Sequence, residues 1–146
     1  MDEIDTKIIN LLQQNGRTSN AALARNLAVS EGTVRRRLRN LIGDGYIHVV
    51  AVVNPGKMGF TSEALLGVQV DPDKIDSVSA DLSSLKEISW VSVTTGTYDV
   101  FAWAILPSAE DLGVFLRTKV GTINGVRKTE TFVNLHVKKR GQGMTL

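Results

Sequence analysis

Residues 30–41, which read SEGTVRRRLRNL, hold four arginines in one short stretch. Apolar residues recur there with the spacing i, i+4 and i+7: Val34, Leu38 and Leu41. This spacing predicts a helix with a single buried stripe. Ser30 is a favourable helix N-cap, and the charge of Glu31 suits the positive end of a helix. The stretch therefore predicts a short helix whose remaining surface is small or basic.

The side chains that point away from the apolar stripe are Gly32, Thr33, Arg36 and Asn40. Arginine presents a planar fork that can grip guanine or phosphate, and Thr and Asn can reach base edges. We predict that this helix reads the major groove of DNA, with Gly32, Thr33 and Arg36 nearest the bases. We predict that Arg35, Arg37, Arg39 and the backbone amides at Ser30 hold phosphates. The DNA-binding residues that we expect also include Glu31 and Asn40. A solvated helix face is the alternative, and for Arg37 and Arg39 an ion pair with Asp44 is another.

Two more helices precede this one. Ile4, Ile8, Leu11 and Leu12 form a stripe over residues 2–14, and Ser19 is placed to cap a helix that ends near Leu27. Only Ala28 and Val29 separate that helix from Ser30. This spacing predicts a helix-turn-helix DNA-binding domain over residues 1–46, although any small helical bundle would also satisfy the apolar pattern.

The charge distribution supports DNA as the partner. The 146 residues carry a formal net charge of only +2, with 42% hydrophobic and 22% charged residues. Residues 1–46 hold seven Lys and Arg against five Asp and Glu, and the rest of the chain holds ten of each. Residues 17–40 alone contain six arginines and one acid. The excess positive charge therefore lies in one segment, as expected for phosphate binding.

A different pattern begins after Gly45. The run YIHVVAVV, ended by Asn54-Pro55-Gly56, predicts a linker strand and turn over residues 47–61, paired with another chain. Residues 62–146 then alternate strand and helix signals in the order β-α-β-β-α-β. The expected fold class is therefore α+β, with a ferredoxin-like C-terminal domain after the helix-turn-helix domain.

The predicted strands are apolar on both faces. Ile88, Trp90, Ala102 and Ala104 share one parity, while Val91, Val93, Phe101, Trp103 and Ile105 share the other. Helices on one side of the sheet would cover only one of these faces. We therefore expect the second face to pack against the same sheet of a partner chain, which predicts a homodimer.

With these motifs in view, the chain resembles the Lrp/AsnC family of feast/famine transcription regulators. The resemblance rests on DEIDTKIINLLQQNGR, LAVSEGTVRRRLRNLIGDGYI and VTTGTYDVF, and it covers nearly the whole length. It implies a helix-turn-helix on operator DNA and a C-terminal domain that dimerises and assembles further, to tetramers or octamers. It also implies small effectors, usually amino acids, bound between subunits.

The effector residues that we expect lie in the connection Gly96-Thr97-Tyr98-Asp99. An amino acid needs an anion site and a cation site, so exposed amides and Thr97 would take its carboxylate and Asp99 its ammonium. Thr129 and Thr131 match the threonine-containing final strand of the family and would line the same pocket. A β-turn with Tyr98 packed and Asp99 bonded to its own backbone is the alternative.

Other function classes have little support. The chain contains no cysteine, and its two histidines, His48 and His136, fall in separate predicted strands without metal-ligand spacing, so we expect no metal or cofactor. No signal-peptide pattern or membrane-length apolar run appears, which predicts a cytoplasmic protein without a membrane partner. No nucleophile or phosphate-loop motif appears, so we predict no catalytic residue. A regulator that senses no ligand, or a small enzyme on a ferredoxin-like sheet, stays as an alternative.

Overall fold

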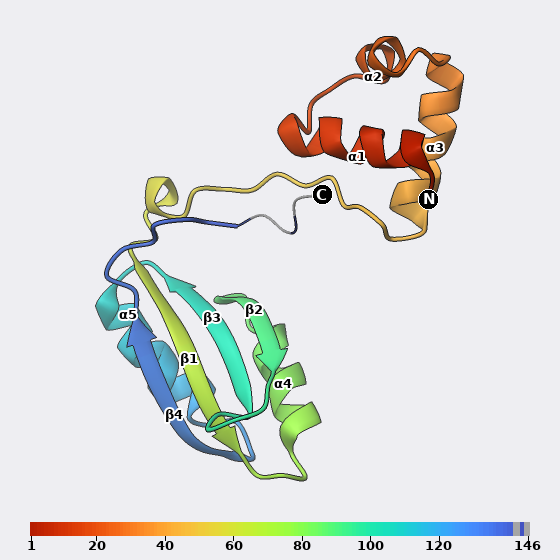
Figure 1. Ribbon diagram of the computed structural model, residues 1–146. Coiled ribbons are helices and arrows are strands. Elements are labelled where there is room, and N and C mark those ends of the chain that lie inside the picture. The colour runs from red at the N-terminus through yellow and green to blue at the C-terminus, as the bar shows by residue number, and fades with distance from the viewer. Residues whose placement is uncertain (142–143, 145–146) are drawn as a thin grey trace. The chain divides into compact units, whose positions relative to one another are not determined.

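The computed structural model describes residues 1–141 and 144 and divides them into two compact units, shown in Figure 1. One unit comprises Met1–Val52 with the described residues after Lys138, and the other comprises Val53–Lys138. Residues 142–143 and 145–146, at the end of the predicted C-terminal domain, lie outside the described residues.

Three helices make up the N-terminal unit: α1 (Glu3–Gln14), α2 (Asn20–Leu27) and α3 (Glu31–Gly43). The side chains of Ser19 and Ser30 accept hydrogen bonds from Ala22 N–H and Thr33 N–H, so both serines are N-caps, as predicted. Ala28 ends α2 in the left-handed conformation, with φ of 53°, which allows the sharp turn into α3.

The apolar stripes of these helices meet in one core. Its buried members are Ile8, Ile9, Leu23, Ala24, Val34 and Leu41. Leu38 and Ile47 are partly buried against them. The i, i+4, i+7 stripe of α3 therefore faces inward, and the opposite side of that helix is exposed.

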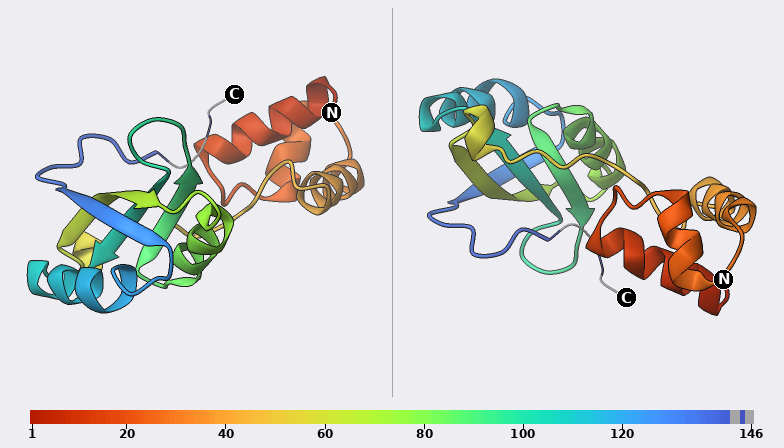
Figure 2. Two further views of the ribbon diagram at one scale, coloured as in Figure 1. Left: turned by 90° about the horizontal axis from the view of Figure 1, so that it is seen from below. Right: turned by 90° about the horizontal axis from the view of Figure 1, so that it is seen from above.

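The second unit is a four-stranded antiparallel sheet with strand order β2-β3-β1-β4. Its elements follow the chain as β1 (Ser62–Val70), α4 (Ile75–Ser84), β2 (Ile88–Val93), β3 (Val100–Leu106), α5 (Ala109–Phe115), a π-helical turn (Leu116–Val120) and β4 (Val126–Val133). Figure 2 shows α4 and α5 on the same side of this sheet. The predicted β-α-β-β-α-β order and ferredoxin-like fold are confirmed.

One face of the sheet forms the core with these helices. Alternate residues of β1 and β3 point into it and are almost fully buried: Ala64, Leu66, Val68, Val100, Ala102 and Ala104. Val78 and Leu82 of α4 and Leu112 and Phe115 of α5 cover them. The opposite face, which we call the open face, has no helix over it among the described residues.

The predicted parity of β2 is wrong. Register shifts between Ile88 and Trp90, so Trp90 pairs with Trp103 and Val91 pairs with Ala102. One extra residue in a strand, a β-bulge, transfers every following side chain to the other face. Trp90 therefore lies on the open face beside Trp103, and Val91 packs against the helices.

The predicted linker strand is not a strand in this single chain. Residues 48–53 make no backbone hydrogen bond with other described residues, and Val50 is 72% exposed. A strand requires a neighbour, and the described part of the chain offers none to this segment. The final strand also ends earlier than predicted, at Val133 rather than Val137, so both predicted strand histidines lie outside strands.

Candidate nucleic-acid interface and ligand site

The N-terminus of α3 is held by a serine cap. Ser30 Oγ accepts from Thr33 N–H at 3.1 Å and lies 2.9 Å from the Thr33 hydroxyl. Glu31 lies in the first turn, where the helix dipole favours an acid. Gly32, between them, is exposed, and a Cβ there would meet nothing closer than 3.8 Å. The start of the helix is therefore fixed by its cap, and Gly32 leaves room for another molecule to approach the backbone closely.

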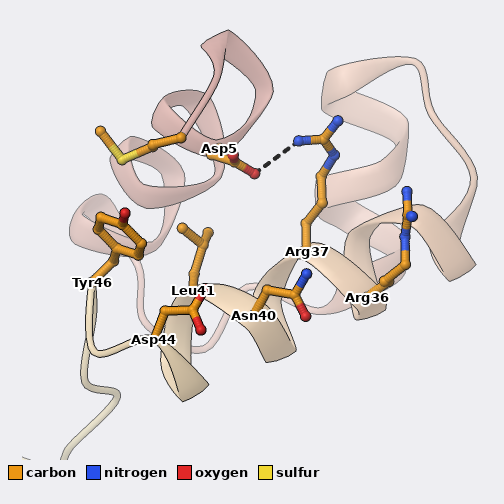
Figure 3. Close-up of a pocket in the computed structure, with 8 residues that line it drawn as sticks. Asp5, Arg36, Arg37, Asn40, Leu41, Asp44 and Tyr46 are labelled. Atoms are coloured by element: carbon orange, nitrogen blue, oxygen red, sulfur yellow. Dashed lines mark hydrogen bonds and ion pairs between the residues drawn. The ribbon is translucent and has the colours of Figure 1, made fainter.

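The outer side of α3 carries its unpaired cations. Arg36 and Arg39 are exposed and have no ion pair or side-chain hydrogen bond with other described residues. Asn40 is exposed one turn after Arg36, and Figure 3 shows the two side chains on the same side of the helix. These three residues lie where the sequence places them, away from the Val34 stripe.

Arg35 has a local partner. Its Nη2 lies 3.0 Å from Glu31 Oε1 one turn earlier, and both side chains are largely exposed. An exposed pair of this kind contributes about 0.3–0.5 kcal/mol, so a phosphate can displace it. Arg35 therefore flanks the outward face as predicted, with Glu31 as its partner in the absence of DNA.

Arg37 is the clear departure from the predicted site. Its Nη1 donates to Asp2 Oδ2 at 2.7 Å and to Asp5 Oδ1 at 2.9 Å, and the side chain is only 23% exposed. Figure 3 shows the contact with Asp5. In the chain without DNA, this internal contact takes the place of the alternative pair with Asp44, and it engages the guanidinium that the predicted phosphate contact would use. Sequence contains a signal for it, because Arg37 lies three residues after Val34 and therefore at the edge of the buried stripe.

The Asp2 carboxyl at the start of α1 responds to this arginine. A hydrogen bond from Asp5 N–H, together with Arg37, lowers the pKa of the Asp2 carboxyl below its usual range. Hydrogen bonds to Asp5 and Asp2 raise the pKa of the Arg37 guanidinium in turn. Asp2 and Arg37 therefore stabilise each other's charged forms.

A polar hollow of about 360 Å³ lies beside these residues, between the start of α1 and the outer side of α3. Figure 3 shows Asp5, Arg36, Asn40, Asp44 and Tyr46 around it. Its acids and its bases are mixed, so it presents neither a concentrated anion site nor a concentrated cation site.

The connection from residue 96 to residue 99 is fastened to the sheet. Asp99 Oδ2 accepts from Val70 N–H at 2.8 Å, and Asp99 N–H donates to Val68 carbonyl at 2.9 Å. Gln69 Nε2 donates to the carbonyl of Thr97 at 3.1 Å. Gly96, with φ of 115°, supplies the positive φ that the turn requires. One carboxylate oxygen of Asp99 is thus used by the neighbouring strand.

Tyr98 packs flat against the open face. A Cβ on Gly67 would lie 2.8 Å from Tyr98 Cγ, so the ring occupies the space that a side chain at residue 67 would fill. The ring also makes edge contacts with Phe101 and Phe132, at centroid distances of 5.5 and 6.3 Å. The packed tyrosine that we gave as the alternative is therefore present.

Thr129 and Thr131 do not line the same surface as Tyr98 within one chain. They pair with Val68 and Leu66, whose side chains point into the helix-covered core. Tyr98 covers Gly67, the residue between those two, on the opposite face. The predicted common pocket is therefore wrong for a single chain, because alternation along β1 separates the two groups.

The open face carries large apolar side chains. Trp90, at 51% exposed, and Trp103 pair across β2 and β3, and Trp103 Nε1 donates to Glu63 Oε2 at 3.1 Å. Phe132 is 43% exposed on β4. Contiguous exposed apolar surface of this kind marks an interaction site.

Within residues 1–141 and 144, no cluster of three His, Cys, Asp or Glu is arranged to hold a metal ion. Within those residues, too, no helix has the length and apolar character needed to cross a membrane.

Comparisons with known proteins match both units. Residues 1–42 match the family model of the AsnC-type helix-turn-helix domain, and residues 63–144 match that of the Lrp/AsnC ligand binding domain. An uncharacterized HTH-type transcriptional regulator of Pyrococcus furiosus is 37% identical over 97% of this chain and 96% of its own. The HTH-type transcriptional regulator Ptr1 of Methanocaldococcus jannaschii is 37% identical over 100% of this chain and 99% of its own.

Solved structures agree with this comparison. E. coli AsnC superposes with a TM-score of 0.88 and 29% identity, over 97% of this chain and 96% of that one. A Neisseria meningitidis transcriptional regulator, solved as an L-Met complex, has a TM-score of 0.89 and 23% identity, over 99% of this chain and 96% of that one.

Proposed function

Because the chain belongs to the Lrp/AsnC family of transcriptional regulators, we propose specific roles for its reading helix, its effector region and its open face. The chain is a DNA-binding transcriptional regulator with a ligand-binding domain, and its named relatives are regulators rather than enzymes. We place the DNA-binding domain at residues 1–46, the linker at 47–61 and the ligand-binding domain at 62–146.

Base reading is the role we assign to the outer side of α3. Arg36 extends from it with no internal partner among the described residues, and this single observation supports the proposal most strongly. Gly32 permits close approach of the backbone to a groove, and Thr33 lies one turn before Arg36. Arg35 and Arg39 hold phosphates on the flanks, with the first amides of α3, while Arg37 has no DNA contact.

The test compares Arg36→Ala with the wild-type chain on two duplexes. One is a duplex selected by the wild-type chain from a random-sequence pool, and the other is a random duplex of equal length. A lost base contact costs about 1–3 kcal/mol on the selected duplex and much less on the random one. An equal loss on both duplexes would show that Arg36 binds only backbone.

A second variant, Arg39→Ala, separates a phosphate contact from a base contact. Arg39→Ala should weaken both duplexes alike and reduce the slope of log affinity against log salt by about one. An unchanged slope would remove Arg39 from the phosphate contacts.

A small effector, an amino acid, is the ligand that we propose for the C-terminal domain. The match to a ligand-binding domain and the L-Met complex of the Neisseria regulator support this class of ligand. Asp99 offers one carboxylate oxygen to an ammonium group, and the amides around Gly96 and Thr97 suit a carboxylate. Thr129 and Thr131 could join this site only from another subunit.

Assembly is the third part of the proposal. The open face pairs with the same face of a second copy, and residues 48–53 of two copies pair as strands, to give a homodimer that assembles further to tetramers or octamers. The exposed Trp90, Phe132 and Val50 support this, because each would otherwise leave apolar surface in water.

One measurement addresses effector and assembly together. The mass of the full-length chain is measured in solution with and without each common amino acid, alongside its melting temperature. A change in mass or stability with one amino acid, lost in Asp99→Ala, supports the site. A response to none favours the regulator without a ligand, and a stable monomer contradicts the sheet-to-sheet dimer.

A further inference from the structure

Arg37, Asp2 and Asp5 form a network in which each of the four carboxylate oxygens accepts a hydrogen bond. Asp2 Oδ1 accepts from Asp5 N–H and Asp5 Oδ2 accepts from Asp2 N–H, each at 3.0 Å, so the two acids cap α1 reciprocally. Their other oxygens, Asp2 Oδ2 and Asp5 Oδ1, both accept from Arg37 Nη1. We call these three residues the α1–α3 clamp.

We propose that the clamp is a positioning device for base reading: it fixes the rotation of α3 about its own axis and so aims Arg36 at the bases. This inference rests on the base-reading role proposed for Arg36. Successive residues of a helix are related by a fixed rotation, so the direction of Arg37 determines the direction of Arg36. Arg37 is therefore a positioning residue that acts without touching DNA.

The apolar core alone fixes this rotation poorly. Contacts of Val34, Leu38 and Leu41 are non-directional, and cores adjust to small shifts by repacking. A charge-assisted hydrogen bond has a preferred length and angle, and here two of them converge on one nitrogen. A small rotation of α3 would break them, and the same rotation would swing the tip of the long Arg36 side chain out of register with a base edge.

Electrostatics explain why two acids are present. The N-terminus of a helix carries partial positive charge, so a lone arginine beside α1 would be repelled. Two carboxylates reverse this, because two negative groups then face the single positive group of Arg37. The lowered pKa of Asp2 agrees with this arrangement.

The experiment uses the full-length chain with the selected and random duplexes described above. Asp5→Asn and Arg37→Gln each break the clamp from one side. Glu3→Gln is the matched control, because it removes an acid from the same turn of α1 whose ion-pair partner is Lys7 of the same helix. Affinity for both duplexes, the salt slope and the melting temperature are measured for each variant.

The result that we expect is a loss of discrimination. Both clamp variants should lower the ratio of selected to random affinity by about fivefold or more, the low end of one lost base contact, while the salt slope stays at the wild-type value. Asp5→Asn is the more stringent test. If the substitution acted only by removing a negative charge near DNA, it would strengthen binding to both duplexes and would not lower the ratio. Glu3→Gln should keep the wild-type ratio.

Two results would overturn the inference. If Arg37→Gln weakens both duplexes equally and reduces the salt slope by about one, Arg37 is a phosphate contact. If both variants only lower the melting temperature and keep the wild-type ratio, the clamp is structural. Arg36→Ala tests the base-reading role independently, since that substitution leaves the clamp intact.

Discussion

Replacing Gly67 with alanine should destabilise the C-terminal domain through a single ring contact. The new Cβ would lie 2.8, 2.9 and 3.0 Å from three carbons of Tyr98. Carbon atoms prefer separations of about 3.5–4.0 Å, so the ring would have to move by more than about half an ångström. It is confined by Phe101 and Phe132 and by the backbone bond from Asp99 N–H to the Val68 carbonyl.

The expected magnitude follows from two opposing terms. Overpacking of this kind costs about 1–3 kcal/mol. Alanine in a strand interior recovers about 0.5–1 kcal/mol relative to glycine. The net loss in the free energy of unfolding should therefore be about 1 kcal/mol from the midpoints of the two ranges, and at most about 2.5 kcal/mol.

Urea unfolding followed by tryptophan fluorescence is the appropriate assay. Both tryptophans, Trp90 and Trp103, lie in the C-terminal sheet, so the signal reports that domain. All variants are compared at one protomer concentration, because association shifts apparent stability. Gly43→Ala is a control, since a Cβ there meets nothing within 4 Å and the residue belongs to α3.

The double variant decides the cause. With Tyr98→Ala already present, Gly67→Ala should cost nothing or should stabilise slightly, because the clash has gone. If Gly67→Ala costs the same with and without the Tyr98 ring, or if the single variant is as stable as the wild type, the proposed contact is not the reason for glycine at this position.

Three further predictions concern the same domain. Asp99→Ala should lower the free energy of unfolding by about 1–3 kcal/mol in urea titrations, because it leaves Val70 N–H without its acceptor; a neutral effect would contradict this. Burial raises the pKa of the Glu87 carboxyl, but hydrogen bonds from Lys119 and from its own backbone together hold it below the ordinary 4.5. Glu87→Gln should therefore be less stable than the wild type at pH 7 by under about 1 kcal/mol, and the difference should vanish as the pH falls through the lowered pKa; a difference that persists at low pH would refute the ion-pair explanation. When the protein is diluted until its measured mass shows that the assembly dissociates, the tryptophan emission should shift to longer wavelength, because Trp90 becomes exposed to water. An unchanged spectrum would place the interface elsewhere.

Local signals in the sequence predicted the helices of the first unit closely. Ser19 and Ser30 act as caps through hydrogen bonds within three residues, so their chemistry is visible in a short window. The β-α-β-β-α-β order was also predicted, since strand and helix periodicities differ strongly. Asp2 is the exception among the caps, because its second partner, Arg37, is distant in the chain.

The errors arise where distant residues decide the outcome. The bulge before Trp90 depends on pairing with β3, and no local pattern reveals an extra residue in a strand. The predicted grouping of Thr129 and Thr131 with Tyr98 rests on the family resemblance, and it fails within one chain because alternation along β1 separates their faces. Residues 48–53 have strand composition but no partner in the described chain, and composition cannot supply a partner.

Site selection by the full-length chain tests the reading helix most directly. The wild-type chain and Arg36→Ala are each used to select duplexes from one random pool. We expect a two-fold symmetric wild-type motif, with half-sites about one helical turn or a multiple of it apart, and loss of preference at one base position per half-site in the variant. An identical motif from both proteins, or no motif from the wild type, would contradict base reading by Arg36.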